Sequence, residues 1–256
     1  MNILKFMDYL RTVRDRLIHI EDKLDDLKNS NLNHFCRDQK WGGVTYSQFG
    51  DDLVIINIFN NLGIEKFTYL DIGAHHPYNI SNTALLYKYG YHGINVEANP
   101  NLIEAFFRER PLDKNVNVGI GTKSGEMPFY MIDGFSGRNS FDKKVVEKFC
   151  QEYPEFSVKE IKKIKVLTLY ELINKYANGK FPDFLSIDIE GLDAEVLRQI
   201  IPDNAPMVID VEVLSMAGQN DENMIDLLKK KGFLPYFKCS SNLIFIRKDI
   251  YEKLQF

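Results

Sequence analysis

The sequence predicts a doubly wound α/β fold with a mostly parallel sheet, and three observations support this. An apolar run at 67–71 ends in an acid, and a glycine turn, a helical segment and a second apolar run at 93–97 follow, which is β-α-β order. Further apolar runs alternate with helical segments beyond it. The closing runs, 233–238 and 243–246, are joined by so short a connection that they can form only an antiparallel hairpin.

The chain begins with a heptad pattern that predicts a coiled coil over residues 2–29. Apolar residues recur at alternating steps of three and four: Ile3, Phe6, Leu10, Val13, Leu17, Ile20, Leu24 and Leu27. Arg16 and Glu21 are placed for an attractive pair between parallel helices. We therefore expect an oligomerisation helix over 1–33 and self-association through it, with two, three or four strands all open. The alternative is that this helix packs on its own catalytic domain, 34–256.

The middle of the chain supplies the remaining elements before the last strands. We expect a helix over 52–62 with Ser47 or Asp51 as N-cap, and a helix over 102–110. The runs 115–120 and 127–132, separated by a turn, predict a hairpin. Residues 143–163 read as a charged helical insertion. Its lysines either meet an anionic acceptor or form a solvated face: Lys159, Lys162, Lys163 and the adjoining Lys165.

The last third contains two strands that end in the same acidic pattern. Residues 181–191 and 207–213 each carry Asp-x-Glu, and a helix over 223–231 follows, ended by Gly232. Alternation along a strand places both acids of each pair on one side. If these two strands are neighbours in the sheet, four carboxylates converge at its edge: Asp188, Glu190, Asp210 and Glu212. Their repulsion calls for a proton, a basic neighbour or a divalent cation such as magnesium.

The acids at the ends of the first two strands predict a nucleoside site. Parallel strands end at one edge, so Asp71 and Glu97 should lie side by side where open α/β sheets bind ligands. Glu97 follows Gly73 at about the spacing that places an acid against ribose hydroxyls. The turn has one glycine and the bulky His75-His76-Pro77, which disfavours a pyrophosphate. A nucleoside ligand without phosphates fits, S-adenosylmethionine being the commonest; helix capping alone is the alternative.

Ordered motifs then carry a resemblance. They are Tyr46-Ser-Gln-Phe-Gly50-Asp-Asp52, Asp71-Ile-Gly-Ala-His-His-Pro77, Ser81-Asn-Thr83, Leu86-Tyr87, Gly90-Tyr-His-Gly93-Ile, Val96-Glu-Ala-Asn-Pro100 and Ser186-Ile-Asp-Ile-Glu-Gly191. Together they resemble the FkbM-like family of S-adenosylmethionine-dependent methyltransferases. The resemblance implies a class I, Rossmann-like sheet of seven strands and methyl transfer to hydroxyl oxygens of glycans or glycosylated metabolites.

The resemblance and the acids at the strand ends together predict the site residues. We expect cofactor contacts from Gln48, Asp71, Gly73, Ala74, His75, Asn82, Thr83, Glu97, Ala98 and Asp188. Asp52 either helps Gln48 close the pocket or simply caps a helix. Arg138 and Ser140 lie in a glycine-punctuated loop that the resemblance places near the acceptor, although such a loop can equally be solvated.

Methyl transfer to oxygen requires alignment and removal of the acceptor's proton. We assign that base to Asp188 or Glu190, acting directly or as a metal ligand. His76 is the second candidate because imidazole titrates near neutral pH, although it can instead shape the loop. A methyltransferase acting on nitrogen or on protein, and a noncatalytic oligomeric ligand-binding scaffold, remain alternatives; an NAD-dependent enzyme would need a phosphate-binding glycine loop.

The composition of the chain limits which classes of partner it can bind. The chain has 256 residues, 45% of them hydrophobic, with a net charge of −4 and a pI near 5.8, so no global positive field recruits nucleic acid. Three widely spaced cysteines predict neither a disulfide framework nor a zinc site. There is no apolar signal core and no run near the ~18 residues of a membrane span. We expect a cytoplasmic protein with a small-molecule or glycan acceptor.

Overall fold

The computed structural model describes residues 44–189, 191–213 and 222–254. The predicted coiled coil over 2–29 and the boundary between residues 33 and 34 lie outside this part, as does Glu190. The coiled coil, the domain boundary and the roles of Glu190 therefore remain predictions.

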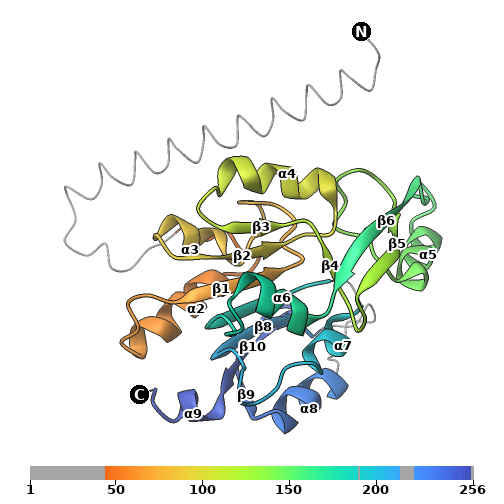
Figure 1. Cartoon of the computed structure of the whole chain (residues 1–256). Helices are drawn as coiled ribbons and strands as arrows, with labels where there is room; N and C mark the ends of the chain where they lie inside the picture. Colours follow the sequence, from red (N-terminus) through yellow and green to blue (C-terminus); the bar gives the residue numbers. More distant parts are fainter. Residues whose placement is uncertain (1–43, 190, 214–221, 255–256) are drawn as a thin grey trace. The chain divides into compact units, whose positions relative to one another are not determined.

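The described chain is built on a mixed seven-stranded sheet of order β3-β2-β1-β7-β8-β10-β9 (Figure 1). Its strands are β1 (Thr68–Ile72), β2 (His92–Val96), β3 (Lys114–Val116), β7 (Phe184–Ile187), β8 (Val208–Glu212), β9 (Phe233–Cys239) and β10 (Asn242–Arg247). The first five in spatial order run parallel. β10 is antiparallel to both β8 and β9. The predicted fold class and its C-terminal hairpin are therefore confirmed.

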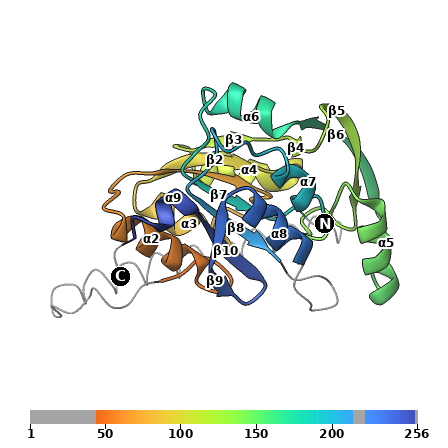
Figure 2. The ribbon, with the colours of Figure 1, turned by 90° about the horizontal axis from the view of Figure 1, so that it is seen from below.

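Two helical layers cover the sheet, because alternate strand residues are apolar on both faces. Leu70 and Ile72 face a core formed with α6 (Leu169–Tyr176), α7 (Asp193–Leu197) and α8 (Glu222–Lys230). Tyr69 faces the other core, formed with α2 (Asp51–Asn61), α3 (Ala84–Lys88) and α9 (Lys248–Tyr251). Figure 2 shows the sheet between these layers.

One predicted strand is in fact two. The run 115–120 leaves the large sheet after Val116, and Gly119–Ile120 forms β4 of a second sheet, ordered β4-β6-β5. Asn117 lies at the break, and its side-chain amide donates to the carbonyls of Glu97 and Ala98. These bonds hold the segment that leads from the large sheet to the second sheet beside the end of β2.

The predicted hairpin over 115–132 and the long helix over 143–163 are wrong. β5 (Gly125–Met131) pairs antiparallel with β6 (Glu160–Leu167), and α5 covers only Lys143–Glu152. In β6, buried Ile164 and Val166 alternate with exposed Lys163 and Lys165. That period of two is a strand pattern, which the run of lysines hides in the sequence.

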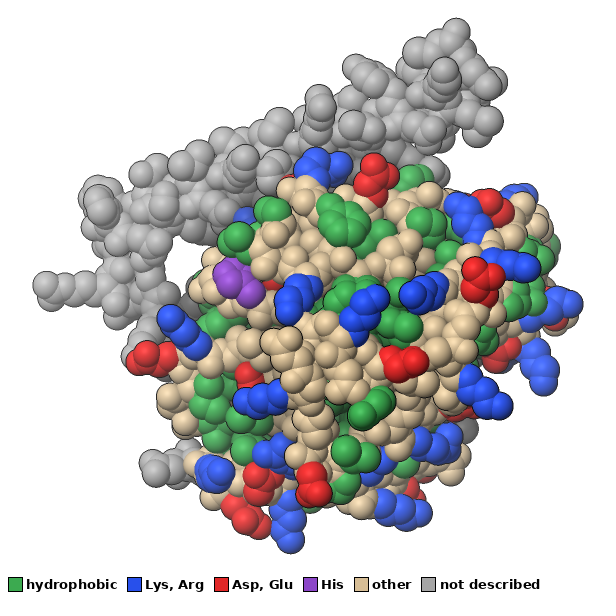
Figure 3. Space-filling model, viewed as in Figure 1, with side chains coloured by type: hydrophobic (Ala, Val, Ile, Leu, Met, Phe, Trp, Pro, Cys, Tyr) green, Lys and Arg blue, Asp and Glu red, His purple; other side chains and the backbone are tan. Residues whose placement is uncertain are grey.

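The visible surface has mixed charge. On the face drawn in Figure 3, basic and acidic side chains are interspersed among the described residues. No helix in the described ranges is long and apolar enough to cross a membrane.

Candidate functional site

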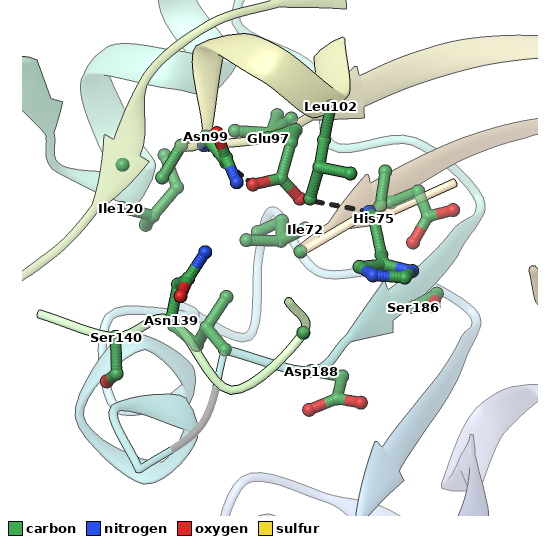
Figure 4. Close-up of a pocket in the computed structure, with 18 of the residues that line it drawn as sticks. Ile72, His75, Glu97, Asn99, Leu102, Ile120, Asn139, Ser140, Ser186 and Asp188 are labelled. Atoms are coloured by element: carbon green, nitrogen blue, oxygen red, sulfur yellow. Dashed lines mark hydrogen bonds between the residues drawn. The ribbon is translucent and has the colours of Figure 1, made fainter. Parts of the chain in front are cut away.

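A cavity of about 400 Å³ opens at the carboxyl ends of β1, β2 and β7. This volume is within the range of roughly 300–1,000 Å³ found for small-molecule sites. Most of the residues predicted from the sequence line it: Gln48, Asp71, Gly73, Ala74, His75, Asn82, Glu97, Ala98, Arg138, Ser140 and Asp188. Figure 4 shows Glu97 and Asp188 on separate sides of the cavity.

The turn after β1 depends on Gly73. Its φ is +83°, and a Cβ built there would lie 1.8 Å from the Asp188 carbonyl oxygen. The backbone N–H groups of Gly73 and Ala74 both donate to the Val96 carbonyl, at 2.9 and 3.2 Å. Gly73 therefore lets the turn fit between the ends of β2 and β7, where no side chain has room.

Glu97, at the end of β2, is a buried carboxylate with fixed orientation. One carboxylate oxygen accepts from the His75 N–H at 2.9 Å and the other from the Asn99 N–H at 2.7 Å (Figure 4). Burial raises the pKa of Glu97 to about 7, although these two bonds favour the charged form and act in the opposite direction. Each oxygen can accept a second hydrogen bond, so the group can also bind hydroxyl donors in the cavity.

Asp71, at the end of β1, also lines the cavity, but Thr83 does not. Thr83 is fully buried behind Asp71 and donates its hydroxyl to the Asp71 carboxylate at 2.6 Å. The predicted cofactor contact from Thr83 is thus indirect. Burial raises the pKa of Asp71, whereas the Thr83 hydroxyl bond and the Arg110 charge lower it.

The two histidines of the turn differ. His76 does not line the cavity, and its Nδ1 accepts from the backbone N–H groups of Tyr78 and Asn79 at 3.1 and 2.9 Å. This geometry favours the loop-shaping interpretation over the catalytic one. His75 does line the cavity; its Nε2 lies 3.4 Å from the Phe135 carbonyl oxygen, and burial lowers its pKa.

The loop after β5 forms another wall of the cavity and meets the turn at His75. The side-chain amides of Asn99 and Asn101, at the start of α4 (Pro100–Glu109), both donate to the Gly134 carbonyl. Ser140 is 1% exposed and its Oγ accepts from the Asp142 N–H. These bonds fasten the loop that brings Arg138 and Ser140 to the cavity, so the loop is not simply solvated.

Asp188 presents an exposed carboxylate to the cavity directly after β7. The backbone that follows is held by Asp193, whose carboxylate accepts from the Ile189 N–H at 3.0 Å and from the Gly191 N–H at 3.3 Å. Sequence analysis missed Asp193. The available signal was an acid in the first turn of the helix that follows the Asp-x-Glu-Gly motif.

The predicted gathering of four carboxylates is not found among the described residues. Asp210 is in register with Ser186 and, through it, with Asp71, so its side chain lies on the α2 face of the sheet. Unlike those two residues, Asp210 does not line the cavity. Glu212 does not line the cavity either. In the described part, no group of three or more His, Cys, Asp or Glu residues is arranged to hold a metal ion. Asp188, Asp210 and Glu212 therefore form no metal site there.

Asp210 and Glu212 lie in different surroundings. Burial raises the pKa of Asp210 well above its ordinary value, and the charge of the equally buried Asp51 adds to this. Within the described ranges, no hydrogen-bond partner lies at ordinary distance from the oxygens of either carboxylate, although the Asn242 side chain lowers the pKa of Asp210 and the Cys239 side chain that of Asp51. Burial raises the pKa of Glu212, and the charge of its basic neighbour Arg138 lowers it.

The segment before α2 carries Gln48 to the cavity. Gly50 is the N-cap, which corrects the expected Ser47 or Asp51. The Asp52 carboxylate accepts from the backbone N–H groups of Tyr46 and Ser47 at 2.8 and 3.3 Å. Asp52 does not line the cavity, so it shapes the segment that holds Gln48.

Comparison with known proteins agrees with the motifs. The sequence profile of the Methyltransferase FkbM domain matches residues 71–235. No curated protein matches the chain.

Two solved structures are similar to the chain at low identity. One is a TehB-like S-adenosylmethionine-dependent methyltransferase from Corynebacterium glutamicum, with 12% identity, a TM-score of 0.39, and coverage of 90% of this chain and 99% of that one. The other is 1,6-didemethyltoxoflavin-N1-methyltransferase from Burkholderia thailandensis, with bound 1,6-didemethyltoxoflavin and S-adenosylhomocysteine. Its identity is 13%, its TM-score 0.37, and the coverage 88% of each chain.

Proposed function

The chain belongs to the FkbM family of methyltransferases, and from that premise we propose that it transfers a methyl group from S-adenosylmethionine to a sugar hydroxyl of a glycan or glycosylated metabolite. The observation that carries the proposal is the placement of two of the cavity's carboxylates, Glu97 and Asp188. Glu97 is held by two backbone N–H groups, and the exposed Asp188 lies on a separate side.

Glu97 marks the nucleoside end. Its ionised oxygens accept hydrogen bonds from the two ribose hydroxyls. The backbone N–H groups of His75 and Asn99 hold the carboxylate in the orientation that this requires. Leu102 and Ile120 line the same region of the cavity (Figure 4) and offer apolar contact to the adenine ring.

Asp71 and the turn that follows bind the methionine end. The Asp71 carboxylate suits the cofactor's α-ammonium group, with which it forms a charge-assisted bond. Gln48 and Asn82 line the cavity and provide side-chain amides for the cofactor's carboxylate.

Asp188 is the base for the acceptor. In the proposed step the acceptor oxygen forms a bond to the methyl carbon while the carbon–sulfur bond breaks and its electron pair returns to sulfur. The acceptor's proton moves to Asp188, and the sulfonium becomes the neutral thioether of S-adenosylhomocysteine. Arg138 and Ser140 hold the acceptor from the loop after β5. Glu190 lies outside the described residues and remains a second candidate for the base.

Methyl transfer from radiolabelled S-adenosylmethionine to panels of sugar, amine and protein acceptors tests this function. We expect label in sugar hydroxyls and loss of transfer in Asp188→Asn. Transfer to amines or protein with an unaffected Asp188→Asn enzyme would favour the nitrogen or protein alternative. Cofactor binding without transfer to any acceptor would favour the scaffold.

We also propose self-association through residues 2–29, on the strength of the heptad pattern alone. Light scattering of the full chain and of a variant lacking residues 1–30 tests this. The full chain should have a multiple of the monomer mass and the truncated chain the monomer mass. A monomeric full chain would contradict it.

A further inference from the structure

We propose that Arg110, acting through Thr83, is a positioning residue that holds the Asp71 carboxylate as an oriented acceptor for the cofactor's α-ammonium group. This rests on the proposed function, because it assigns the methionine end of the cofactor to Asp71. Neither Arg110 nor Thr83 lines the cavity.

A full positive charge is buried directly behind the site. Arg110 is 0% exposed, and its guanidinium donates to the Thr83 hydroxyl oxygen at 3.0 Å and to the Tyr69 hydroxyl oxygen at 2.8 Å. A buried charge is costly unless it is paired, and Asp113 pairs with it at 2.9 Å.

The hydrogen bonds from Arg110 to Thr83 and from Thr83 to Asp71 have a fixed direction. A guanidinium can only donate, so the Thr83 oxygen must accept from Arg110. The single hydroxyl hydrogen of Thr83 is then available for Asp71, and the Thr83 oxygen lies 2.6 Å from the Asp71 carboxylate. Arg110 thereby fixes Thr83 as a donor, and Asp71 receives that bond only as an acceptor.

The relay formed by Arg110, Thr83 and Asp71 is anchored in the sheet through Asp113. The Asp113 carboxylate also accepts from the Gly93 N–H at 2.8 Å and from the Asn95 side chain at 2.9 Å, both on β2. It further accepts from the Tyr69 hydroxyl, on β1. The ion pair is thus fixed to the two strands that present Asp71 and Glu97, and Thr83 links it to the Asp71 carboxylate.

The positive charge of Arg110 and the hydrogen bond from Thr83 both favour the ionised form of Asp71. Burial raises the pKa of Asp71, while the Thr83 hydroxyl and the Arg110 charge lower it. A neutral Asp71 would not attract an ammonium group. The relay therefore favours the form of Asp71 that can bind the amino-acid end of the cofactor.

Two ligands separate this role from general damage to the pocket. S-adenosylhomocysteine has the amino-acid end and 5′-methylthioadenosine lacks it, while both contain adenosine. The variants are Thr83→Val, which removes the hydroxyl at nearly constant volume, and Thr83→Ser, which keeps it. By calorimetry we expect Thr83→Val to weaken S-adenosylhomocysteine about tenfold or more, and Thr83→Ser to remain within about twofold of wild type. The affinity for 5′-methylthioadenosine should not change in either variant.

Unchanged S-adenosylhomocysteine affinity in Thr83→Val would overturn the inference, as would an equal loss of both ligands in a folded variant. If valine prevents folding, Thr83→Ser and Thr83→Ala form a second pair that differs by one hydroxyl, with the same expectations. A wild-type chain that binds neither ligand would instead refute the proposed function, and this inference with it.

Discussion

Cofactor affinity should depend on pH through Glu97. The structure places the pKa of this buried carboxyl at about 7 in the free protein. Ribose hydroxyls donate hydrogen bonds, so they bind the ionised form and not the protonated one. Lowering the pH from 8 to 6 reduces the ionised fraction about tenfold, and the Kd for S-adenosylhomocysteine should rise by the same factor, or about 1.4 kcal/mol.

The origin of the shift makes the prediction specific. Burial is the largest cause and raises the pKa, the backbone N–H groups of Asn99 and His75 lower it, and the charge of Asp71 raises it again. Because the bound ligand favours the charged form, binding near pH 7 should release about half a proton.

Calorimetry at about pH 6, 7 and 8, in buffers of different ionisation enthalpy, measures both the Kd and the released proton. Glu97→Gln serves as the control, because it cannot titrate and should lose the dependence. His75 also lines the cavity and its pKa is lowered by burial, so His75→Asn shows whether the histidine contributes. Equal Kd values at the two pH extremes, or a tenfold change that persists in Glu97→Gln, would refute the reasoning.

Three further changes have defined outcomes. Gly73→Ala places a Cβ 1.8 Å from a carbonyl oxygen at φ +83°, and should lower the free energy of unfolding by about 2 kcal/mol or more in urea titrations; normal stability would contradict that packing. The raised pKa of Asp210 means that the folded state keeps a proton that the unfolded state releases, so stability should fall as the pH rises above the ordinary range of an aspartate. Asp210→Asn should reduce this loss in unfolding measured between about pH 5 and 8, and an unchanged slope would contradict it. Asp188→Asn should lower kcat about 10²–10⁴-fold while the Kd for S-adenosylhomocysteine changes less than tenfold; near-normal turnover would remove Asp188 as the base.

The β-α-β unit and the acids at the ends of its strands could be predicted from the sequence. Asp71 and Glu97 terminate apolar runs on either side of a helical segment, and that local pattern fixes which edge of a parallel sheet they share. The cavity lies where this reasoning placed it, with both acids in its wall.

The support behind the site could not be predicted, because it depends on contacts between distant segments. Arg110 and Asp113 read as solvated charges around the end of a helix, yet both side chains are 0% exposed in the structure. Nothing in the local sequence shows that Tyr69 and Thr83 will meet them. Asp210 is similar, because its strand pattern gives the side of the sheet but not the neighbouring Asp51.

One missed element did have a local signal. Thr168 and Glu171 form a capping box at the start of α6, and this spacing of a hydroxyl and an acid before an apolar run is recognisable in sequence. By contrast, β6 resembles a solvated helix because charged residues, three of them lysines, occupy half of its positions, and only the burial of Ile164 and Val166 reveals the strand.

The most direct test of the central claim is calorimetric titration of the chain with S-adenosylhomocysteine, with NAD as the control ligand, with and without magnesium. We expect binding to S-adenosylhomocysteine but not to NAD, no effect of magnesium, and loss of binding in Glu97→Ala. No binding of S-adenosylhomocysteine under any of these conditions, or equal binding by Glu97→Ala, would contradict the assignment of this cavity to the cofactor.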